Sequence, residues 1–219
     1  MKLATYTDLI RTLPVRSLIF RSKRETWEKA LKTKALPNDL EEIFDKGDQV
    51  PISRQDIFDE AAKTVPNLKK VVYLTILWGY PTGWNIRVHF PSIVGQMPKL
   101  TQILEKAREC DIPDWTDHFR VISSLPGLKL STYSKLLYFL GVKVESYDAL
   151  ILDQRLLAVF ENKVFDDFLE LAHLKYGKAS HYVCYLRKID AVAQSLAVPK
   201  ENVEMFLFTF GSQLKANER

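Results

Sequence analysis

Apolar residues recur at helical spacing along most of this chain, whereas patterns typical of strands are nearly absent. One example is the apolar stripe near the C-terminus formed by Val203, Phe206, Leu207, Phe210 and Leu214. Residues three and four positions apart share one face of a helix, so this stripe predicts a helix with one buried side. Alternation with a period of two appears only in residues 84–90, which we interpret as a strand after a turn at 79–83.

The predicted fold is therefore all-α, with at most one short β-hairpin, in one compact unit or in two lobes around a cleft. Expected helices cover residues 3–13, 25–36, 40–46, 57–65, 68–78, 100–110, 114–124, 131–140, 153–162, 165–174, 180–196 and 201–214. Segment 68–78 is rich in β-branched residues, but its length favours a buried helix. The break at Pro66 and Asn67 separates an N-terminal helical region of unassigned role, 1–65, from a larger helical domain, 66–219.

The composition supports a sizeable core, since 47% of the 219 residues are hydrophobic. Lysine and arginine number 31 against 27 acidic residues, which gives a formal net charge of +4. This charge is compatible with a polyanionic partner but is much weaker than that of a basic tail. Charge alone therefore assigns no partner.

The two cysteines, Cys110 and Cys184, are too few for a disulfide framework or for a four-cysteine zinc or iron–sulfur site within one chain. The four histidines form no HxxxH or HExxH pair, and the glycine motifs for phosphate loops and dinucleotides are missing. We therefore expect no metal and no cofactor. The longest apolar run, 71–78, is too short to span a membrane, so we expect a cytoplasmic protein, most simply a monomer, with no membrane partner.

The most informative motif is a helix, a tight turn at Leu125-Pro126-Gly127, and a second helix that begins at Ser131 or Thr132. Backbone N–H groups of such a hairpin and of the first turn of its second helix can converge on one nucleic-acid phosphate. An ordinary corner between two helices of a bundle gives the same pattern. Both interpretations stay open on this motif alone.

A second motif follows in residues 149–152, where four apolar residues lead directly into Asp153 at a helix start. This arrangement places a carboxylate at the mouth of a buried segment. An aspartate there can also be a plain N-cap, worth about 1 kcal/mol.

Together the two motifs resemble the helix-hairpin-helix DNA glycosylase superfamily, most closely its 8-oxoguanine DNA glycosylase-like branch. In that branch a Leu-Pro-Gly hairpin and a helix with a Ser-Lys pair, here Ser134-Lys135, precede an Ile-Leu-Asp segment, here ending in Asp153. The likeness covers roughly residues 65–214, and its specific part is 125–153. Some members of the superfamily carry a four-cysteine iron–sulfur cluster, so a chain with two cysteines is more similar to the cluster-free branch.

The resemblance implies an enzyme that cleaves the N-glycosidic bond of a damaged or modified base, 8-oxoguanine above others, in double-stranded DNA. Asp153 is the implied essential carboxylate, which stabilises the positive charge that develops on the sugar. The base is extruded from the duplex into a pocket. Candidates to line that pocket or to act as a wedge in the duplex are Trp78, Tyr80, Trp84, Tyr133 and Phe208.

The nucleophilic lysine of the bifunctional members has no counterpart at its usual place. In the family pattern L-P-G-h-G-x-K, the second glycine corresponds to Lys129 here and the lysine to Ser131. Lys135 lies four residues further, on the same helix face and one turn deeper. Three alternatives stay open: Lys135 is the nucleophile after a longer hairpin, Lys129 is the nucleophile, or the enzyme has no lyase activity and uses water.

Several residues are candidates for contacts with the DNA backbone. They are Leu125, Gly127, Lys129 and Ser131 in or beside the hairpin, with Arg120 and Arg155. A residue other than glycine at position 129 is strained if its φ is positive. Arg155 could instead pair with Asp153. The alternative function classes are a non-enzymatic DNA-binding module of a repair or phage-defence assembly and a helical interaction domain without a DNA role.

Overall fold

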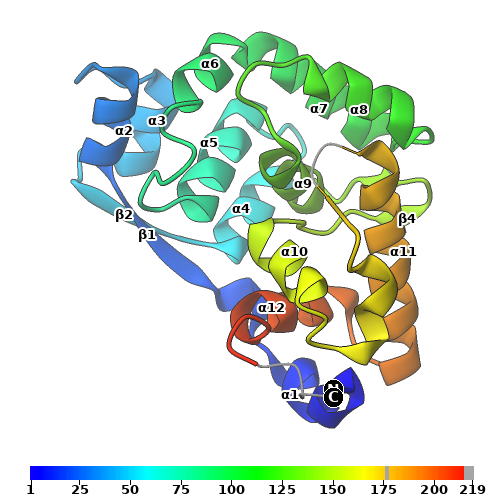
Figure 1. The fold of residues 1–219 in the computed structure, drawn as a ribbon. Helices are drawn as coiled ribbons and strands as arrows, with labels where there is room; N and C mark the ends of the chain where they lie inside the picture. Colours follow the sequence, from blue (N-terminus) through cyan, green and yellow to red (C-terminus); the bar gives the residue numbers. More distant parts are fainter. Residues whose placement is uncertain (176–177, 215–219) are drawn as a thin grey trace.

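The computed structural model describes residues 1–175 and 178–214, and it is mostly α-helical with two small antiparallel strand pairs (Figure 1). This confirms the predicted fold class. The α-helices are α1 (Thr7–Thr12), α2 (Arg24–Leu31), α3 (Asn38–Phe44), α4 (Arg54–Ala61), α5 (Leu68–Gly79), α6 (Phe90–Gly95), α7 (Met97–Cys110), α8 (Trp115–Ser123), α9 (Leu130–Phe139), α10 (Gln154–Glu161), α11 (Ala179–Leu196) and α12 (Lys200–Phe210). Three short 3₁₀ helices are η1 (Leu3–Tyr6), η2 (Val15–Ser17) and η3 (Asp166–Leu171). Within the described ranges, no helix is long and apolar enough to cross a membrane.

Helix α5 is the buried helix that the sequence predicts for residues 68–78. All of its residues from Val71 to Trp78 are buried. Asn67 caps its first turn by accepting a hydrogen bond from the Lys70 N–H at 3.1 Å. The helix packs against α3, α4, α7 and α9 and against both strands of the first sheet. Neighbouring elements cover residues 71–78 on all sides. This part of the helix therefore carries apolar side chains on every face and shows little amphipathic pattern.

The two strand pairs differ in how their strands are connected. Strand β1 (Ile19–Lys23) pairs antiparallel with β2 (Gln49–Ser53), and helices α2 and α3 lie between them in the sequence. Ser53 is the last residue of β2 and the N-cap of α4. It forms a capping box with Asp56 in the first turn of that helix. Strands β3 (Lys143–Val144) and β4 (Tyr147–Asp148) make the single β-hairpin of the described residues.

The strand predicted for residues 84–90 is wrong. That segment forms consecutive turns closed by local hydrogen bonds, such as the one from the Arg87 N–H to the Gly83 carbonyl at 2.9 Å. Gly83 and Asn85 have φ angles of +69° and +64°, and left-handed residues interrupt an extended strand. The alternating apolar residues therefore do not share one buried face: Ile86 and Phe90 are buried, whereas Trp84 and Val88 are 78% and 81% exposed.

The helix predicted for residues 165–174 is also different in the structure. Only Asp166–Leu171 is helical, as the 3₁₀ helix η3. Phe168 leaves the helical region with φ −119° and ψ 17°. This kink prevents a regular α-helix, although Phe168 still points into the core with 2% of its surface exposed.

A buried ion pair joins the N-terminal part of the chain to its C-terminal helix. Arg54 of α4 donates two hydrogen bonds to the Glu204 carboxylate of α12, at 2.9 and 3.3 Å, and the two side chains are 1% and 0% exposed. Arg54 also donates to the Tyr138 hydroxyl of α9 at 3.2 Å and lies 5.1 Å from the centroid of the Trp78 ring of α5. Burial raises the pKa of Glu204, and the Arg54 guanidinium opposes that rise. One charge pair therefore ties four helices together.

Replacing Glu204 by Gln is expected to lower the free energy of unfolding by about 3–5 kcal/mol, because it leaves the Arg54 charge buried without a counter-charge. Urea unfolding measures this loss. The matched control is Glu201→Gln in the same helix, whose side chain is 27% exposed, with an expected loss of about 1 kcal/mol or less. The double change of Arg54→Met with Glu204→Leu should recover much of the stability. Equal losses for the two single variants would contradict this account.

Candidate active site

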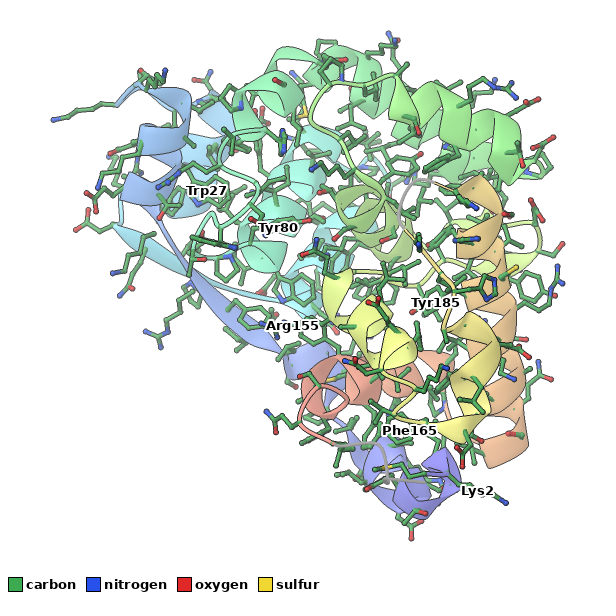
Figure 2. The ribbon with its side chains drawn as sticks, viewed as in Figure 1. Lys2, Trp27, Tyr80, Arg155, Phe165 and Tyr185 are labelled. Carbon is green, nitrogen blue, oxygen red and sulfur yellow. The ribbon has the colours of Figure 1, made fainter. Side chains whose placement is uncertain are left out.

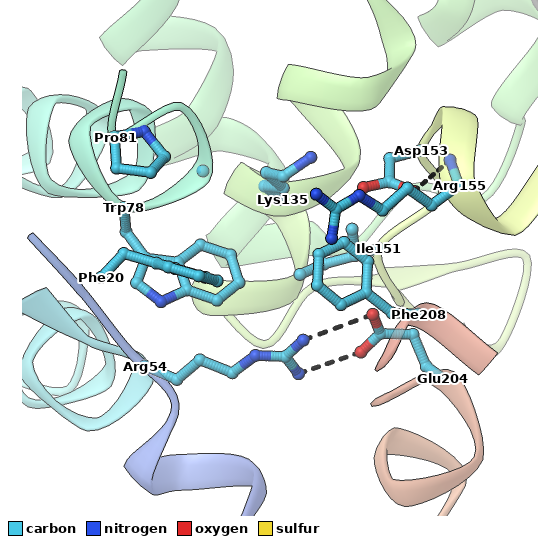
Figure 3. A pocket seen from close by; sticks show the side chains of 11 residues that line it. Phe20, Arg54, Trp78, Pro81, Lys135, Ile151, Asp153, Arg155, Glu204 and Phe208 are labelled. Atoms are coloured by element: carbon cyan, nitrogen blue, oxygen red, sulfur yellow. Dashed lines mark hydrogen bonds and ion pairs between the residues drawn. The ribbon is translucent and has the colours of Figure 1, made fainter. Parts of the chain in front are cut away.

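A pocket of about 130 Å³ lies where β1, α4, α5, α9, α10 and α12 meet (Figure 3). Its lining consists of Phe20, Arg54, Trp78, Gly79, Pro81, Lys135, Ile151, Asp153, Arg155, Glu204 and Phe208. Aromatic and aliphatic side chains form much of the wall, and the Arg54–Glu204 pair lies at one end. The lining carries three cationic and two acidic side chains, so its formal charge favours an anionic ligand.

Lys135 brings a buried ammonium group into this pocket from α9. The side chain is only 4% exposed. Its Nζ donates to the Ser131 carbonyl at 3.1 Å and to Ser131 Oγ at 3.2 Å, and it lies 5.2 Å from the centroid of the Tyr80 ring. Among the described residues, no carboxylate forms an ion pair with it. A charged group buried without a counter-ion is costly for folding, which marks Lys135 as a functional candidate.

Gly79, the last residue of α5, leaves room for the stem of Lys135. A Cβ atom on Gly79 would lie 2.9 Å from Lys135 Cδ and 3.0 Å from Cε. Any larger residue at this position would therefore displace the lysine stem. The position of the ammonium thus depends on a glycine from another helix.

Asp153 lies opposite Lys135 in the pocket and also caps α10. Its Oδ1 accepts hydrogen bonds from the N–H groups of Arg155 and Leu156 at 3.0 and 3.2 Å. In Figure 3 the carboxylate faces the pocket from the side opposite the lysine. The cap uses one carboxylate oxygen, so the capping role and a role in the pocket are compatible.

The extended segment that precedes Asp153 is held by three buried hydroxyl groups. The pairs are Tyr182 Oη with the Leu150 carbonyl (2.8 Å), Tyr185 Oη with the Ile151 carbonyl (2.7 Å; Tyr185 is labelled in Figure 2) and Ser134 Oγ with the Leu152 N–H (3.1 Å). Burial raises the pKa values of both tyrosines, which keeps them protonated as donors. Because Ser134 is next to Lys135 on α9, one helix positions both the lysine and the segment that carries Asp153.

The hairpin between α8 and α9 has the expected order of helix, tight turn and helix. Gly127 has a φ of +82°, and a Cβ there would lie 2.8 Å from the His89 carbonyl oxygen. Lys129 has φ −112° and ψ 161°, so the strain expected from a positive φ at this position does not arise. Its side chain makes no capping bond, so the amide groups in the first turn of α9 have no side-chain partner there.

The pocket brings together five of the residues that the sequence singles out. They are Trp78, Lys135, Asp153, Arg155 and Phe208. The Arg155 side chain is exposed, and its guanidinium lies 4.8 Å from the centroid of the Phe208 ring rather than in an ion pair with Asp153. Two further candidates, Tyr80 and Ser131, contact the Lys135 ammonium.

The remaining candidates lie outside the pocket lining. Lys129 is exposed in the hairpin, and Arg120 is exposed on α8, where it pairs with Asp117 at 2.7 Å. Trp84 is 78% exposed on the turns that follow α5, and its role as a wedge stays a prediction. Tyr133 is fully buried and Leu125 is 3% exposed, so both are core residues.

Sequence reasoning misses three pocket residues, Phe20, Arg54 and Glu204. Only Glu204 carries a local signal, because it is a charged residue within the apolar stripe of α12. Phe20 and Arg54 come from the N-terminal region, far from the motifs in sequence. Among the described residues, no group of three or more His, Cys, Asp or Glu side chains could hold a metal ion.

Comparison with known proteins identifies a family. The family model described as "Putative 8-oxoguanine DNA glycosylase OGG-like protein" matches residues 14–208, which is more than four-fifths of the chain. The match begins well before residue 65, where the sequence resemblance was expected to begin. No curated protein and no solved structure matches the chain.

His118 of α8 gives the hairpin region a testable dependence on pH. Its Nε2 lies 2.6 Å from the Tyr133 hydroxyl of α9, and its ring stacks on Trp115. Burial, with a smaller contribution from the Lys106 charge, lowers the pKa of His118 from its usual 6.5. The unfolded chain therefore binds this proton more readily than the folded one, and stability falls as the pH drops below about 6.5. In urea unfolding experiments across this pH range, the free energy of unfolding of His118→Gln should decrease less steeply with falling pH than that of the unaltered protein. The same pH dependence in both proteins would contradict the assignment.

Proposed function

Because this chain belongs to the 8-oxoguanine DNA glycosylase OGG-like family, we propose that it excises a damaged base from double-stranded DNA, with 8-oxoguanine as the favoured lesion. One observation carries this proposal: Lys135 and Asp153 face each other in one pocket with aromatic walls. The finer parts of the proposal are the identity of the base and an additional cleavage of the abasic strand. The first rests on the family match, and the second rests on the chemistry of Lys135.

In the proposed reaction, the extruded base enters the pocket, where the partly exposed Phe208 ring offers a surface for stacking and the buried Trp78 ring forms part of the wall. The neutral Lys135 amine attacks C1′ of the sugar, the N-glycosidic bond breaks, and the base leaves with the bonding electrons. The lysine nitrogen, which becomes positively charged when it bonds to C1′, then loses the proton that neutralises the departing base. Positive charge develops on the sugar as this bond weakens. The Asp153 carboxylate stabilises that charge, because an anion held in place by the hydrogen bonds of its helix cap is oriented before the charge develops.

Lys135 is the favoured nucleophile among the three alternatives. It is buried in the pocket that contains Asp153, whereas Lys129 is exposed in the hairpin and does not line the pocket. With Lys135 as nucleophile, a Schiff base forms and the abasic strand can be cleaved by elimination. The first turn of α9, which has no side-chain cap, and the exposed Arg155 side chain are suited to contact phosphates of the bound duplex.

Lys135→Gln is expected to abolish the covalent adduct that borohydride traps between the protein and a duplex with 8-oxoguanine or an abasic site. The matched control, Lys129→Gln, should form the adduct normally, because that side chain is outside the pocket. Intact excision without an adduct in the unaltered protein would indicate a monofunctional enzyme that uses water.

Asp153→Asn should lower the single-turnover excision rate by about 10²–10³-fold while duplex binding persists. Full activity of this variant would reject the assigned role of Asp153. Binding without excision of any base by the unaltered protein would favour a non-enzymatic DNA-binding module instead.

Gly79→Ala is expected to slow adduct formation, because the added methyl group displaces the Lys135 stem. The control is Gly95→Ala, since a Cβ at Gly95 meets no atom within 4 Å. Both glycines end helices and neither has a positive φ, so the conformational effects of the two changes are similar. The two variants are compared by their rates of borohydride trapping. Equal rates would show that Gly79 does not position the lysine.

A further inference from the structure

The ammonium group of Lys135 must lose a proton before its nitrogen can attack carbon, since only the neutral amine has a free electron pair. Two of its three N–H donors are directed at Ser131, one at the carbonyl and one at Oγ. A backbone carbonyl cannot pass a proton onward. A hydroxyl group can, because it accepts one proton while it donates another.

Ser131 Oγ is in turn connected to Tyr80. Its oxygen lies 3.2 Å from the Tyr80 hydroxyl, which also lies 3.0 Å from Thr132 Oγ1. Lys135 Nζ, Ser131 Oγ and Tyr80 Oη thus form a continuous chain of hydrogen bonds. Lys135 is buried, whereas Ser131 and Tyr80 are half-buried, so the chain runs from the pocket toward solvent.

The other charged groups of the pocket form no hydrogen bond with the Lys135 ammonium among the described residues. They are Arg54 of α4, Glu204 of α12, Arg155 of α10 and Asp153 at the N-cap of α10. Neither carboxylate forms an ion pair with Lys135. Glu204 is instead bonded to Arg54, and Asp153 Oδ1 is bonded to two backbone amides.

We propose that Ser131 and Tyr80 form a proton relay that converts the Lys135 ammonium into the neutral amine. An N–H bond of Lys135 breaks as its proton moves to Ser131 Oγ, the Ser131 proton moves to Tyr80 Oη, and the Tyr80 proton leaves to solvent water. Each hydroxyl gains one proton and loses one, so no other reactant is needed. This proposal rests on the proposed function, in which Lys135 is the nucleophile.

The test measures the rate of Schiff-base formation with an abasic duplex by borohydride trapping, from mildly acidic to alkaline pH. Ser131→Ala removes the first acceptor, and Tyr80→Phe removes the second while its ring stays over the ammonium. Both variants should react about 10²-fold more slowly at neutral pH. The deficit should shrink at alkaline pH, because hydroxide then removes the proton directly. Ser131→Thr keeps a hydroxyl and should retain the rate.

Rates equal to those of the unaltered protein would overturn the relay. An equal loss at every pH would also overturn it, because that result indicates a structural role for these side chains. Thermal unfolding of each variant confirms that it is folded. If the unaltered protein forms no adduct, or if the adduct survives Lys135→Gln, the proposed nucleophile fails and the relay fails with it. An adduct that requires Lys135 but not the two hydroxyls rejects the relay alone.

Discussion

The ion pair between Arg54 and Glu204 holds together the helices that surround the pocket. Its two charges are almost fully buried, and each is stabilised mainly by the other. The pair joins α4 to α12, while the contacts of Arg54 with Tyr138 and Trp78 add α9 and α5. The paired charges at the end of the pocket are stabilised by their mutual hydrogen bonds, although Arg54 Nε has no hydrogen-bond partner among the described residues. The N-terminal region is therefore part of the site's construction, although its role was unassigned from the sequence.

Around this ion pair, α9 sets most of the site geometry. Lys135 projects into the pocket from this helix, and its neighbour Ser134 holds the segment that ends in Asp153. The first turn of the same helix borders the hairpin and provides Ser131, which contacts the lysine. A single rigid helix thus relates a candidate phosphate-binding turn to a candidate nucleophile and to a carboxylate. Such coupling suits a reaction that requires a bound duplex and an extruded base at the same time.

Local sequence patterns were most informative where the structure of a segment depends mainly on residues within the same segment. The Leu-Pro-Gly turn, the helical stripe of α12 and the run of apolar residues before Asp153 depend on neighbours in sequence, and the structure contains each of them. The interpretation of residues 84–90 as a strand failed because the alternation of residue types does not correspond to an alternation of burial. Ile86 and Phe90 are buried, whereas Trp84 and Val88 are exposed. Left-handed residues at Gly83 and Asn85 form turns in place of an extended strand.

The sequence by itself determined the mostly helical fold and the tight turn between two helices at residues 125–127. These features follow from helical periodicity and from turn chemistry, which act over a few residues. Only the tertiary structure decided between Lys135 and Lys129 as the residue in the pocket, and only it brought Phe20, Arg54 and Glu204 to the site. Burial and contact between distant segments depend on how helices pack. No local spacing contains that information.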